Sequence, residues 1–325
     1  MLSIVIPVFN EADSLATLHG ELSEVAAASG YAIDVIFVDD GSTDGTWQLI
    51  RRLAAEDRRV RGIRFRRNFG KAAALSAGFA VAAGEMVMTL DADLQDDPHE
   101  IPRFLAAMGD DLDVVSGWKK VRHDPWHKVL PSRIFNRLVS SLTGVRLHDH
   151  NCGMKCYRRE VLAEVRLYGE LHRFVPVLAA GRGFRIGELT INHRRRKFGR
   201  SKYGVTRFIK GFLDLLTVKF LTGFGQRPQH VLGTVGLGLF FLGAIGLTFL
   251  AAAWAVSRFD VIPMADIHLN ERPSLFYSIV LLLVGAQFMS IGFLAELFVA
   301  YHDPESKGYS ISDRTFPVED EIDPR

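Results

Sequence analysis

Two acidic residues follow an apolar run in the segment TLDADLQDD, and their spacing suggests metal chemistry. The run Met86–Leu90 has the composition of a buried strand, and Asp91 and Asp93 come directly after it. Residues two apart in an extended segment point to the same side, so both carboxylates would face one position, with Gln95 in phase. A pair of like charges needs a cation beside it, and hard oxygen ligands suit Mg²⁺ or Mn²⁺ carrying a diphosphate. We therefore predict a metal site at Asp91, Asp93 and Gln95.

A second pair of acids, Asp39 and Asp40, ends the apolar run Ile33–Val38 and precedes a glycine-containing turn. In an open parallel sheet, ligands bind beyond the carboxyl ends of the strands, so these two acids are also candidates for a ligand site. Acids after strands can instead start turns and cap helices, and we expect that structural role for three others: Asp44, Asp96 and Asp97.

A basic stretch, HRRRKFGRSK, places six Lys or Arg in the nine positions from Arg194 to Lys202. Arginine can bind phosphate oxygens as a fork and lysine as a point charge. We assign phosphate binding to Arg200, Ser201 and Lys202, and we expect Arg194 to Lys197 at the membrane surface. The alternative is that the whole stretch is solvated and attracts anionic lipid.

The elements that must position these residues alternate between strand and helix patterns over the first 120 residues. Helical spacing separates the short apolar runs, which predicts an α/β fold with a mostly parallel sheet covered by helices on both faces. The expected strands are Leu2–Val8, Ile33–Val38, Val60–Phe65, Met86–Leu90 and Leu112–Ser116. Neither a GxGxxG turn after the first strand nor a Walker P-loop occurs, so the sequence does not favour a dinucleotide site of the Rossmann type.

Two long uncharged segments, Val231–Ser257 and Leu275–Ala295, stand near the C-terminus. About 20 apolar residues in a helix cross a bilayer, so we predict a two-helix membrane hairpin; the alternative is a pair of buried core helices. Four basic residues precede the first span, whereas acids offset the bases of the connecting loop. This bias predicts a cytoplasmic catalytic domain with both termini on the same side. We expect Glu296 to reach the membrane interface.

The segment Gly204–Phe224 has apolar residues at helical spacing and predicts an amphipathic helix in the membrane interface; the alternative is a soluble helix packed on the domain. The expected organisation is a catalytic domain over 1–203, this helix and linker over 204–230, the hairpin over 231–301 and a polar acidic tail over 302–325. The hairpin also offers a surface for homo-oligomerisation.

Composition excludes several functional classes. The 39 Lys and Arg against 37 Asp and Glu give a net charge of +2, too small for a nucleic-acid binder that works through a basic field. Two cysteines in 325 residues exclude a disulfide-stapled scaffold. These cysteines lie near two histidines, so a zinc site is an alternative for His148, His150, Cys152 and Cys156, although the cysteine spacing differs from that of common zinc knuckles.

Four motifs, SIVIPVFNE, VDDGSTDGT, RNFGKAAAL and DADLQDDP, resemble those of glycosyltransferase family 2, which has the GT-A fold. Two later segments, DHNCGMKCYRREV and GRSKYG, are similar to those of polyisoprenyl-phosphate glycosyltransferases, which also carry an amphipathic helix and membrane spans. The segment VVSGWKKVR departs from the VxGSR of dolichyl-phosphate mannose synthases. The QxxRW motif of processive polysaccharide synthases does not occur, so the resemblance favours single-sugar transfer.

The resemblance implies roles for individual residues. Asp39, with Asp40 beside it, would bind the base and ribose of the nucleotide. Asp91 would serve the nucleotide or the metal, Asp93 would be a direct metal ligand, and Gln95 would lie in the metal shell. Three further residues would line the nucleotide cleft: Pro7, Phe9 and Glu11.

The expected reaction transfers one sugar from a nucleoside diphosphate sugar to a polyprenyl phosphate, with inversion. UDP-glucose is favoured as donor by resemblance, GDP-mannose is the alternative, and the acceptor would be undecaprenyl or dolichyl phosphate. A phosphate monoester is largely ionised at pH 7, so the acceptor needs positive charge and positioning more than a base. Arg133 and Lys155 are candidates to bind it, and Asp149 could orient it or take a residual proton, or be structural.

Two other functions fit the sequence. One is a membrane-bound family 2 transferase whose acceptor is a glycan or diacylglycerol. The other is a catalytically silent scaffold or sugar-nucleotide sensor.

Overall fold

The computed structural model describes residues 1–120, 126–165, 167, 171–194, 206–223, 228–258 and 272–302. These residues fall into two compact units, one within Met1–Gly223 and one within Phe224–Tyr309. The first unit contains the residues that the sequence analysis assigned to chemistry, and the second contains the two long apolar helices.

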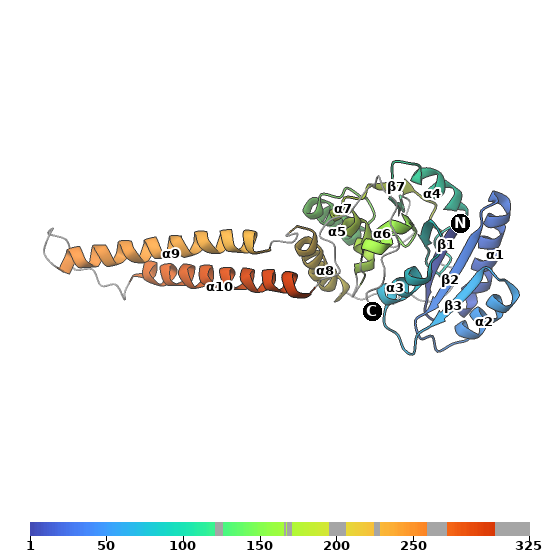
Figure 1. Cartoon of the computed structure of the whole chain (residues 1–325), viewed down its shortest axis with the longest axis horizontal. Helices are drawn as coiled ribbons and strands as arrows, with labels where there is room; N and C mark the ends of the chain where they lie inside the picture. The colour runs from blue at the N-terminus through green and yellow to red at the C-terminus, as the bar shows by residue number, and fades with distance from the viewer. Residues whose placement is uncertain are drawn as a thin grey trace, which may run out of the picture. The chain divides into compact units, whose positions relative to one another are not determined.

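A seven-stranded sheet with the order β3-β2-β1-β4-β6-β5-β7 forms the centre of the first unit (Figure 1). Strand β6 is antiparallel to its neighbours β4 and β5, and the other pairs are parallel. The strands are β1 Leu2–Val8, β2 Ile33–Asp39, β3 Val60–Arg64, β4 Met86–Thr89, β5 Val114–Trp118, β6 Lys155–Arg158 and β7 Ile186–Thr190.

Helices cover both faces of this sheet, because successive residues of the central strands point to opposite faces and both sides are apolar. In β1, Ile4 and Ile6 pack with α1, α2 and α4, whereas Val5 packs with α3. Helices α6 and α7 cover β5 and β6 on the α3 side. The bounds are α1 Ala12–Ser29, α2 Thr46–Glu56, α3 Lys71–Val81, α4 Ile101–Met108, α6 Arg159–Glu164 and α7 Val175–Gly181, with short 3-10 turns η1 at Pro98–Glu100 and η2 at Leu171–Phe174.

The expected α/β fold and all five expected strands are confirmed; the bounds of β1 are the expected ones, and the ends of the other four differ by at most two residues. Two strands, β6 and β7, were not expected. Strand β6 has four residues, two of them charged, and β7 is a half-exposed edge strand, so neither shows the apolar signal of a central strand. Helix α5 extends over Trp126–Thr143 and includes Pro131 inside it.

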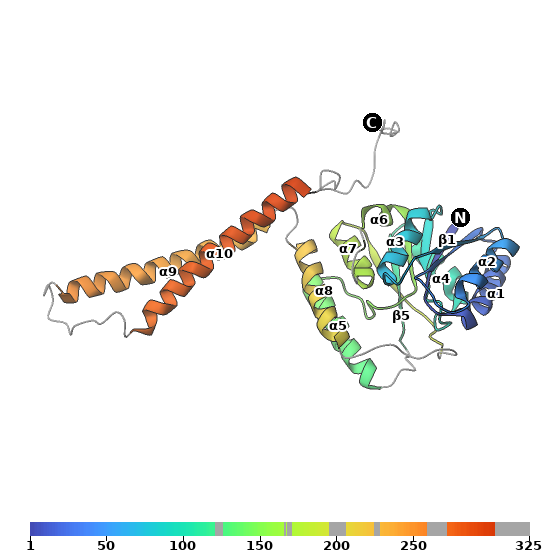
Figure 2. The same cartoon turned by 90° about the horizontal axis from the view of Figure 1, so that it is seen from below.

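Helix α8, Thr206–Gly223, packs on the first unit beside α5 and α7 (Figure 2). Leu215 and Val218 are fully buried in that contact. On its other side Phe212, Leu213 and Leu216 are about half exposed. The helix therefore packs on the domain through one apolar side, as the alternative interpretation expects, and leaves a second apolar side uncovered; its place at a membrane interface stays a prediction.

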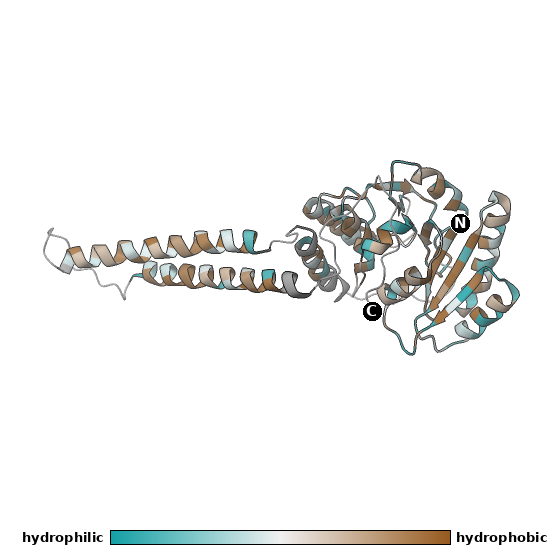
Figure 3. Cartoon of the chain, viewed as in Figure 1, coloured by the Kyte–Doolittle hydropathy of each residue, from teal (hydrophilic) through white to brown (hydrophobic). Residues whose placement is uncertain are grey.

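The second unit is a hairpin of α9, Pro228–Arg258, and α10, Pro273–His302. Both helices are long and apolar enough to cross a membrane (Figure 3), and 17% of the most apolar window of each is buried. Glycines at a spacing of seven bring the two backbones together: Gly236 and Gly243 on α9 face Gly285 and Ser278 on α10. Small residues at such spacing are the usual means of close helix contact in membranes.

Glu296 has a specific role at the start of this hairpin. Its carboxylate accepts a hydrogen bond of 3.1 Å from the backbone N–H of Gln229, in the first turn of α9. An acid at a helix N-terminus satisfies a free N–H and interacts favourably with the helix dipole. Glu296 therefore ties the end of α10 to the beginning of α9.

The close contact in the hairpin predicts opposite effects for two alanine substitutions on α9. A Cβ at Gly243 would come within 2.6 Å of backbone atoms of Ser278 and Leu282, whereas a Cβ at Gly238 meets nothing within 4 Å. We expect Gly243→Ala to lower the melting temperature of the detergent-solubilised protein. Gly238→Ala should leave it unchanged or raise it, because alanine favours helix. Equal effects of the two substitutions would contradict this packing.

Candidate active site at the carboxyl edge of the sheet

Charged residues from four strands meet at one edge of the sheet. Asp39 is the last residue of β2, Asp91 stands two residues after β4, and Lys119 directly follows β5. Strand β6 is antiparallel and therefore begins at this same edge, where its first residue, Lys155, lies opposite Thr89 of β4. The unexpected strand β6 thus adds a buried cation to the site.

Asp91 forms an ion pair with Lys71, the first residue of α3, and each side chain is one-third exposed. Burial would raise the pKa of Asp91, but Lys71, with Lys119 and Lys155 nearby, lowers it to about 2. Asp91 is therefore a carboxylate at neutral pH. Lys71 was not among the predicted site residues; the signal for it was its place in the RNFGKAAAL motif, after a glycine and at the start of a helix.

A second ion pair, which is buried, connects Lys119 to Asp96, with 2.8 Å between Nζ and Oδ1. Asp96 has no exposed surface, so the expectation that it only starts a turn is wrong. Burial favours the neutral amine of Lys119, but Asp96 outweighs it and raises the pKa of Lys119. The structural roles expected for Asp44 and Asp97 are confirmed, because each accepts a backbone hydrogen bond from the residue two positions later.

Lys155 and Asp149 lie beneath these pairs and are almost completely buried. Lys155 donates a hydrogen bond to the carbonyl of Cys152, and burial lowers its pKa. The Asp149 carboxylate accepts from the backbone N–H of Asn151 at 3.1 Å. Its negative charge acts on Lys155 in the direction that keeps the amine protonated.

Hydrogen bonds connect the loops after β1 and β2 into one surface, which we call the wall. It contains the residues expected to bind nucleotide. The side chain of Asn10 accepts from the N–H of Thr43 at 2.8 Å, and the N–H of Glu11 donates to Thr46 at 3.0 Å. Asp39 is fully buried and accepts from the N–H of Ser42 at 2.9 Å. The structure brings five predicted residues to this wall: Pro7, Phe9, Glu11, Asp39 and Asp40.

Asp40 stabilises the backbone of the loop that precedes α3. Its two oxygens accept hydrogen bonds from the N–H groups of Phe69 and Gly70, at 2.7 and 2.9 Å. Burial raises its pKa, and these two hydrogen bonds partly offset that effect. Asp40 thereby fixes the loop that leads into α3 and to Lys71.

The predicted metal ligands Asp91, Asp93 and Gln95 lie on one loop, and Asp93 accepts from the N–H of Gln95 at 3.2 Å. The described residues contain no group of three or more His, Cys, Asp or Glu that could hold a metal ion. Asp91 and Asp93 offer carboxylate oxygens and Gln95 an amide oxygen, which are the ligand types that Mg²⁺ and Mn²⁺ take together with a diphosphate and water.

The side chains proposed as an alternative zinc site have other partners. His148 binds Glu188 at 2.6 Å, and His150 binds Ser140 at 3.0 Å. Cys152 and Cys156 are buried, and burial raises the pKa of each thiol to about 12, so neither is a thiolate at neutral pH. These contacts argue against zinc, because zinc-bound cysteine is deprotonated.

A cavity of about 830 Å³ lies between the end of β5 and α5. Arg133, predicted to bind the acceptor, lines it together with Lys119, which connects it to Asp96. The exposed apolar residues Leu130 and Ile134 also line it. Further members of the lining are Trp118, Lys120, Arg137, Arg146 and His148, and the rings of Trp118 and His148 stack at 4.1 Å. The cavity therefore combines positive charge with an apolar wall.

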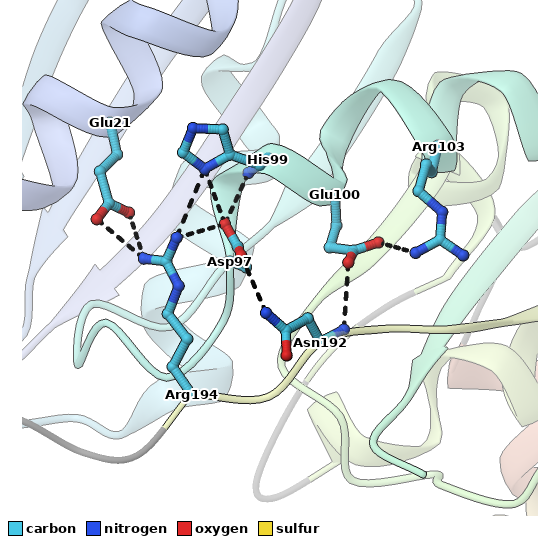
Figure 4. Close-up of polar contacts among 7 residues, drawn as sticks. All are labelled: Glu21, Asp97, His99, Glu100, Arg103, Asn192 and Arg194. Carbon is cyan, nitrogen blue, oxygen red and sulfur yellow. Dashed lines mark hydrogen bonds and ion pairs between the residues drawn. The ribbon is translucent and has the colours of Figure 1, made fainter. Parts of the chain in front are cut away.

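Two other predictions concern the basic stretch. Arg200, Ser201 and Lys202 lie outside the described residues. Arg194 does not face a membrane surface as expected; it forms ion pairs with Glu21 at 2.7 Å and Asp97 at 2.6 Å (Figure 4).

A mostly parallel sheet with acids at its carboxyl edge is the architecture of GT-A nucleotide-sugar transferases, and solved structures bear out this likeness. Mannosyl-3-phosphoglycerate synthase from Rubrobacter xylanophilus aligns with a TM-score of 0.56 and 15% identity, over 69% of this chain and 75% of that one. Glucosyl-3-phosphoglycerate synthase from Mycobacterium tuberculosis, in complex with Mn²⁺, UDP and phosphoglyceric acid, aligns with a TM-score of 0.54 and 17% identity, over 68% and 78%. The expected GT-A fold is confirmed.

The family model described as glycosyl transferase family 2 matches residues 3–166. Dodecaprenyl-phosphate galacturonate synthase of Rhizobium johnstonii is 37% identical over 95% of this chain and 91% of that protein. Undecaprenyl-phosphate 4-deoxy-4-formamido-L-arabinose transferase of Aeromonas hydrophila is 35% identical, over 91% of this chain and 87% of that protein. The chain belongs to glycosyl transferase family 2.

The buried pair of Lys119 and Asp96 predicts a large loss of stability when only one partner is removed. In Lys119→Met, Asp96 would remain as an uncompensated buried charge, which costs about 3–5 kcal/mol of folding free energy. The double substitution Lys119→Met with Asp96→Asn should recover much of this loss. Thermal unfolding in detergent measures both, and a double variant no more stable than Lys119→Met would contradict the pairing.

The close approach of Gly153 to Asp91 predicts that an alanine at residue 153 lowers turnover. A Cβ at residue 153 would lie 2.5–2.8 Å from the carboxyl atoms of Asp91, so Gly153→Ala must displace that carboxylate. We expect Gly153→Ala to reduce turnover at least tenfold. Gly20→Ala on α1, where a Cβ meets nothing within 4 Å, is the control. Wild-type turnover of Gly153→Ala would mean that the position of Asp91 is not critical.

Proposed function

We propose that this enzyme transfers one sugar from a nucleoside diphosphate sugar to a polyprenyl phosphate. The observation that carries the proposal is a cavity with cationic and apolar lining that is connected through Lys119 to the acidic edge of a GT-A sheet. The names of two relatives at 35–37% identity, both polyprenyl-phosphate sugar enzymes, support the same acceptor class.

The nucleotide sugar would bind along the wall formed by the loops after β1 and β2, with Asp39 toward the base and ribose. Asp91, Asp93 and Gln95 would hold Mg²⁺ or Mn²⁺, which would stabilise the negative charge that develops on the leaving diphosphate. A solved GT-A neighbour is a complex with Mn²⁺ and UDP-glucose, which supports a divalent ion here. We assign the diphosphate also to Arg200, Ser201 and Lys202.

The lipid phosphate would bind in the cavity, where Arg133 and Lys119 supply positive charge and Leu130 and Ile134 meet the first isoprene units. Its second pKa is about 6, so it is largely a dianion at pH 7 and can attack without a strong base. The enzyme's contribution is then to align the phosphate oxygen behind the anomeric carbon. Asp149 would orient the acceptor or take a residual proton, and a single displacement inverts the anomeric centre.

Because the proposed acceptor is a lipid, the enzyme must act at a membrane surface. We propose that α9 and α10 cross the bilayer with the catalytic unit and both termini in the cytoplasm, because basic residues precede the first span. The uncovered apolar side of α8, together with Leu130 and Ile134 of α5, would lie at the interface, at the depth of the lipid phosphate.

The reaction is tested by mass spectrometry of lipids after incubation of the purified protein with undecaprenyl phosphate, Mn²⁺ or Mg²⁺ and a panel of donors. The panel contains UDP-glucose, the donor favoured by resemblance, together with GDP-mannose and UDP-galacturonate. We expect a lipid heavier by one sugar residue, absent with Asp93→Ala. An unchanged lipid with a protein that binds the donor would overturn the acceptor and favour a glycan or diacylglycerol instead.

The position of Arg133 in the cavity predicts that its substitution changes the KM for the lipid phosphate and not the KM for the nucleotide sugar. Arg133→Gln should raise the KM for undecaprenyl phosphate about tenfold or more, because it removes a charged contact to phosphate, while the KM for the nucleotide sugar stays unchanged. Arg52→Gln on the exposed face of α2 is the control for loss of a positive charge. Equal changes in both KM values would contradict the assignment of the cavity to the lipid phosphate.

A further inference from the structure

The loop that carries the predicted metal ligands, residues 91–97, is called the metal loop, and a short segment at the start of the basic stretch, residues 192–194, is bonded to it. Residues Asp96 and His193 form an antiparallel bridge, and the backbone N–H of Arg194 donates to the carbonyl of Gln95 at 2.9 Å. Nearby, the side chain of Asn192 donates to Asp97 at 3.4 Å. The backbone around Gln95, one of the predicted metal-shell residues, is therefore attached to this segment.

The side chain of Arg194 extends this attachment to α1 (Figure 4). Its Nη1 contacts both carboxylate oxygens of Glu21 at 2.7 and 2.9 Å, and its Nη2 contacts Asp97 at 2.6 Å. Arg194 and Glu21 are about one-quarter and one-fifth exposed, so the pairs are largely shielded from solvent. Arginine can make such a bridge because its guanidinium presents several donors in a fixed plane.

The loop needs such support because its backbone is strained. Leu94, between the two predicted ligands Asp93 and Gln95, has a φ of +60° and is buried. For a bulky L-residue this left-handed conformation costs about 1–2 kcal/mol, and it persists only where the surrounding structure holds it. The bridge from α1 through Arg194 to Asp97 lies three residues from Leu94 and supplies this restraint.

We propose that Arg194 is a positioning residue, which clamps the strained metal loop to α1 and so sets the geometry in which Asp93 and Gln95 receive the metal and the diphosphate. The inference rests on the proposed function, since it assigns a support to that same site. Glu21 lies on α1, which contributes no predicted ligand. Because Arg194 is attached to α1 through Glu21, substitution of Glu21 should also change substrate binding.

The test measures Mn²⁺-dependent binding of UDP to the detergent-solubilised full chain by calorimetry. Loss of a residue that orients metal ligands typically costs 10–100-fold in affinity, so we expect Arg194→Gln to weaken binding at least tenfold. Glu21→Gln should weaken it in the same direction. Arg194→Lys, which keeps the charge without the planar fork, should be intermediate.

Arg182→Gln is the matched control. Arg182 pairs with Glu164 at 3.0 Å with similar exposure, and this pair connects the residue after α7 to the last residue of α6, whereas Arg194 pairs with α1 and with Asp97. We expect it to change the melting temperature as much as Arg194→Gln does and to leave UDP binding unchanged. A merely structural role of Arg194 would make the two variants alike in both measurements.

The outcomes separate this inference from the function on which it rests. GDP replaces UDP in the same titrations if UDP does not bind, and wild-type protein without Mn²⁺-dependent binding of either nucleotide would overturn the proposed function and the clamp together. Wild-type binding with unchanged affinity in Arg194→Gln would overturn the clamp alone. Unchanged affinity in Glu21→Gln with weakened binding in Arg194→Gln would also overturn it, because Arg194 would then act without α1.

Discussion

The candidate site depends on one electrostatic constraint, which is that carboxylates largely withdrawn from water at the edge of the sheet, Asp91 by two-thirds and Asp96 completely, must be balanced by cations from neighbouring elements. A carboxylate charge taken out of water is costly unless a positive charge lies beside it. Lys71 from α3 and Lys119 from the end of β5 provide it. This pairing explains why α3 must begin close to the end of β4, and why the loop that leads into α3 is fixed to β2 through Asp40.

One of these charged residues also connects the proposed metal site to the cavity proposed for the lipid phosphate. Lys119 pairs with Asp96 of the metal loop and also lines the cavity assigned to the lipid phosphate, so one residue touches both regions. Helix α5, which carries Arg133, packs on α8 through a buried apolar cluster. The position of Arg133, which we propose binds the acceptor, therefore depends on the helix that precedes the hairpin in the chain. This arrangement gives a physical reason for joining a catalytic unit and a membrane hairpin through α8.

The sequence predicted those parts that have strong local signals. The five apolar strands, the acids that follow them and the two long uncharged helices could be found because each depends on neighbouring residues only. Strand β6 could not, because its four residues are stable as a strand only between β4 and β5. The roles of Lys71, Asp96 and Arg194 were missed for a related reason. Each depends on a partner 20 or more residues away in sequence, and charge spacing along the chain does not reveal such partners.

The central claim is that the charged edge of the sheet binds a metal and the diphosphate of a nucleotide sugar. The most direct test is an experimental structure of the full chain with Mn²⁺ and UDP. The account predicts Mn²⁺ bound to the carboxylate of Asp93, with the diphosphate beside it and the uracil against the wall that contains Asp39. UDP bound with its diphosphate away from Asp91 and Asp93, or Mn²⁺ bound elsewhere, would contradict it.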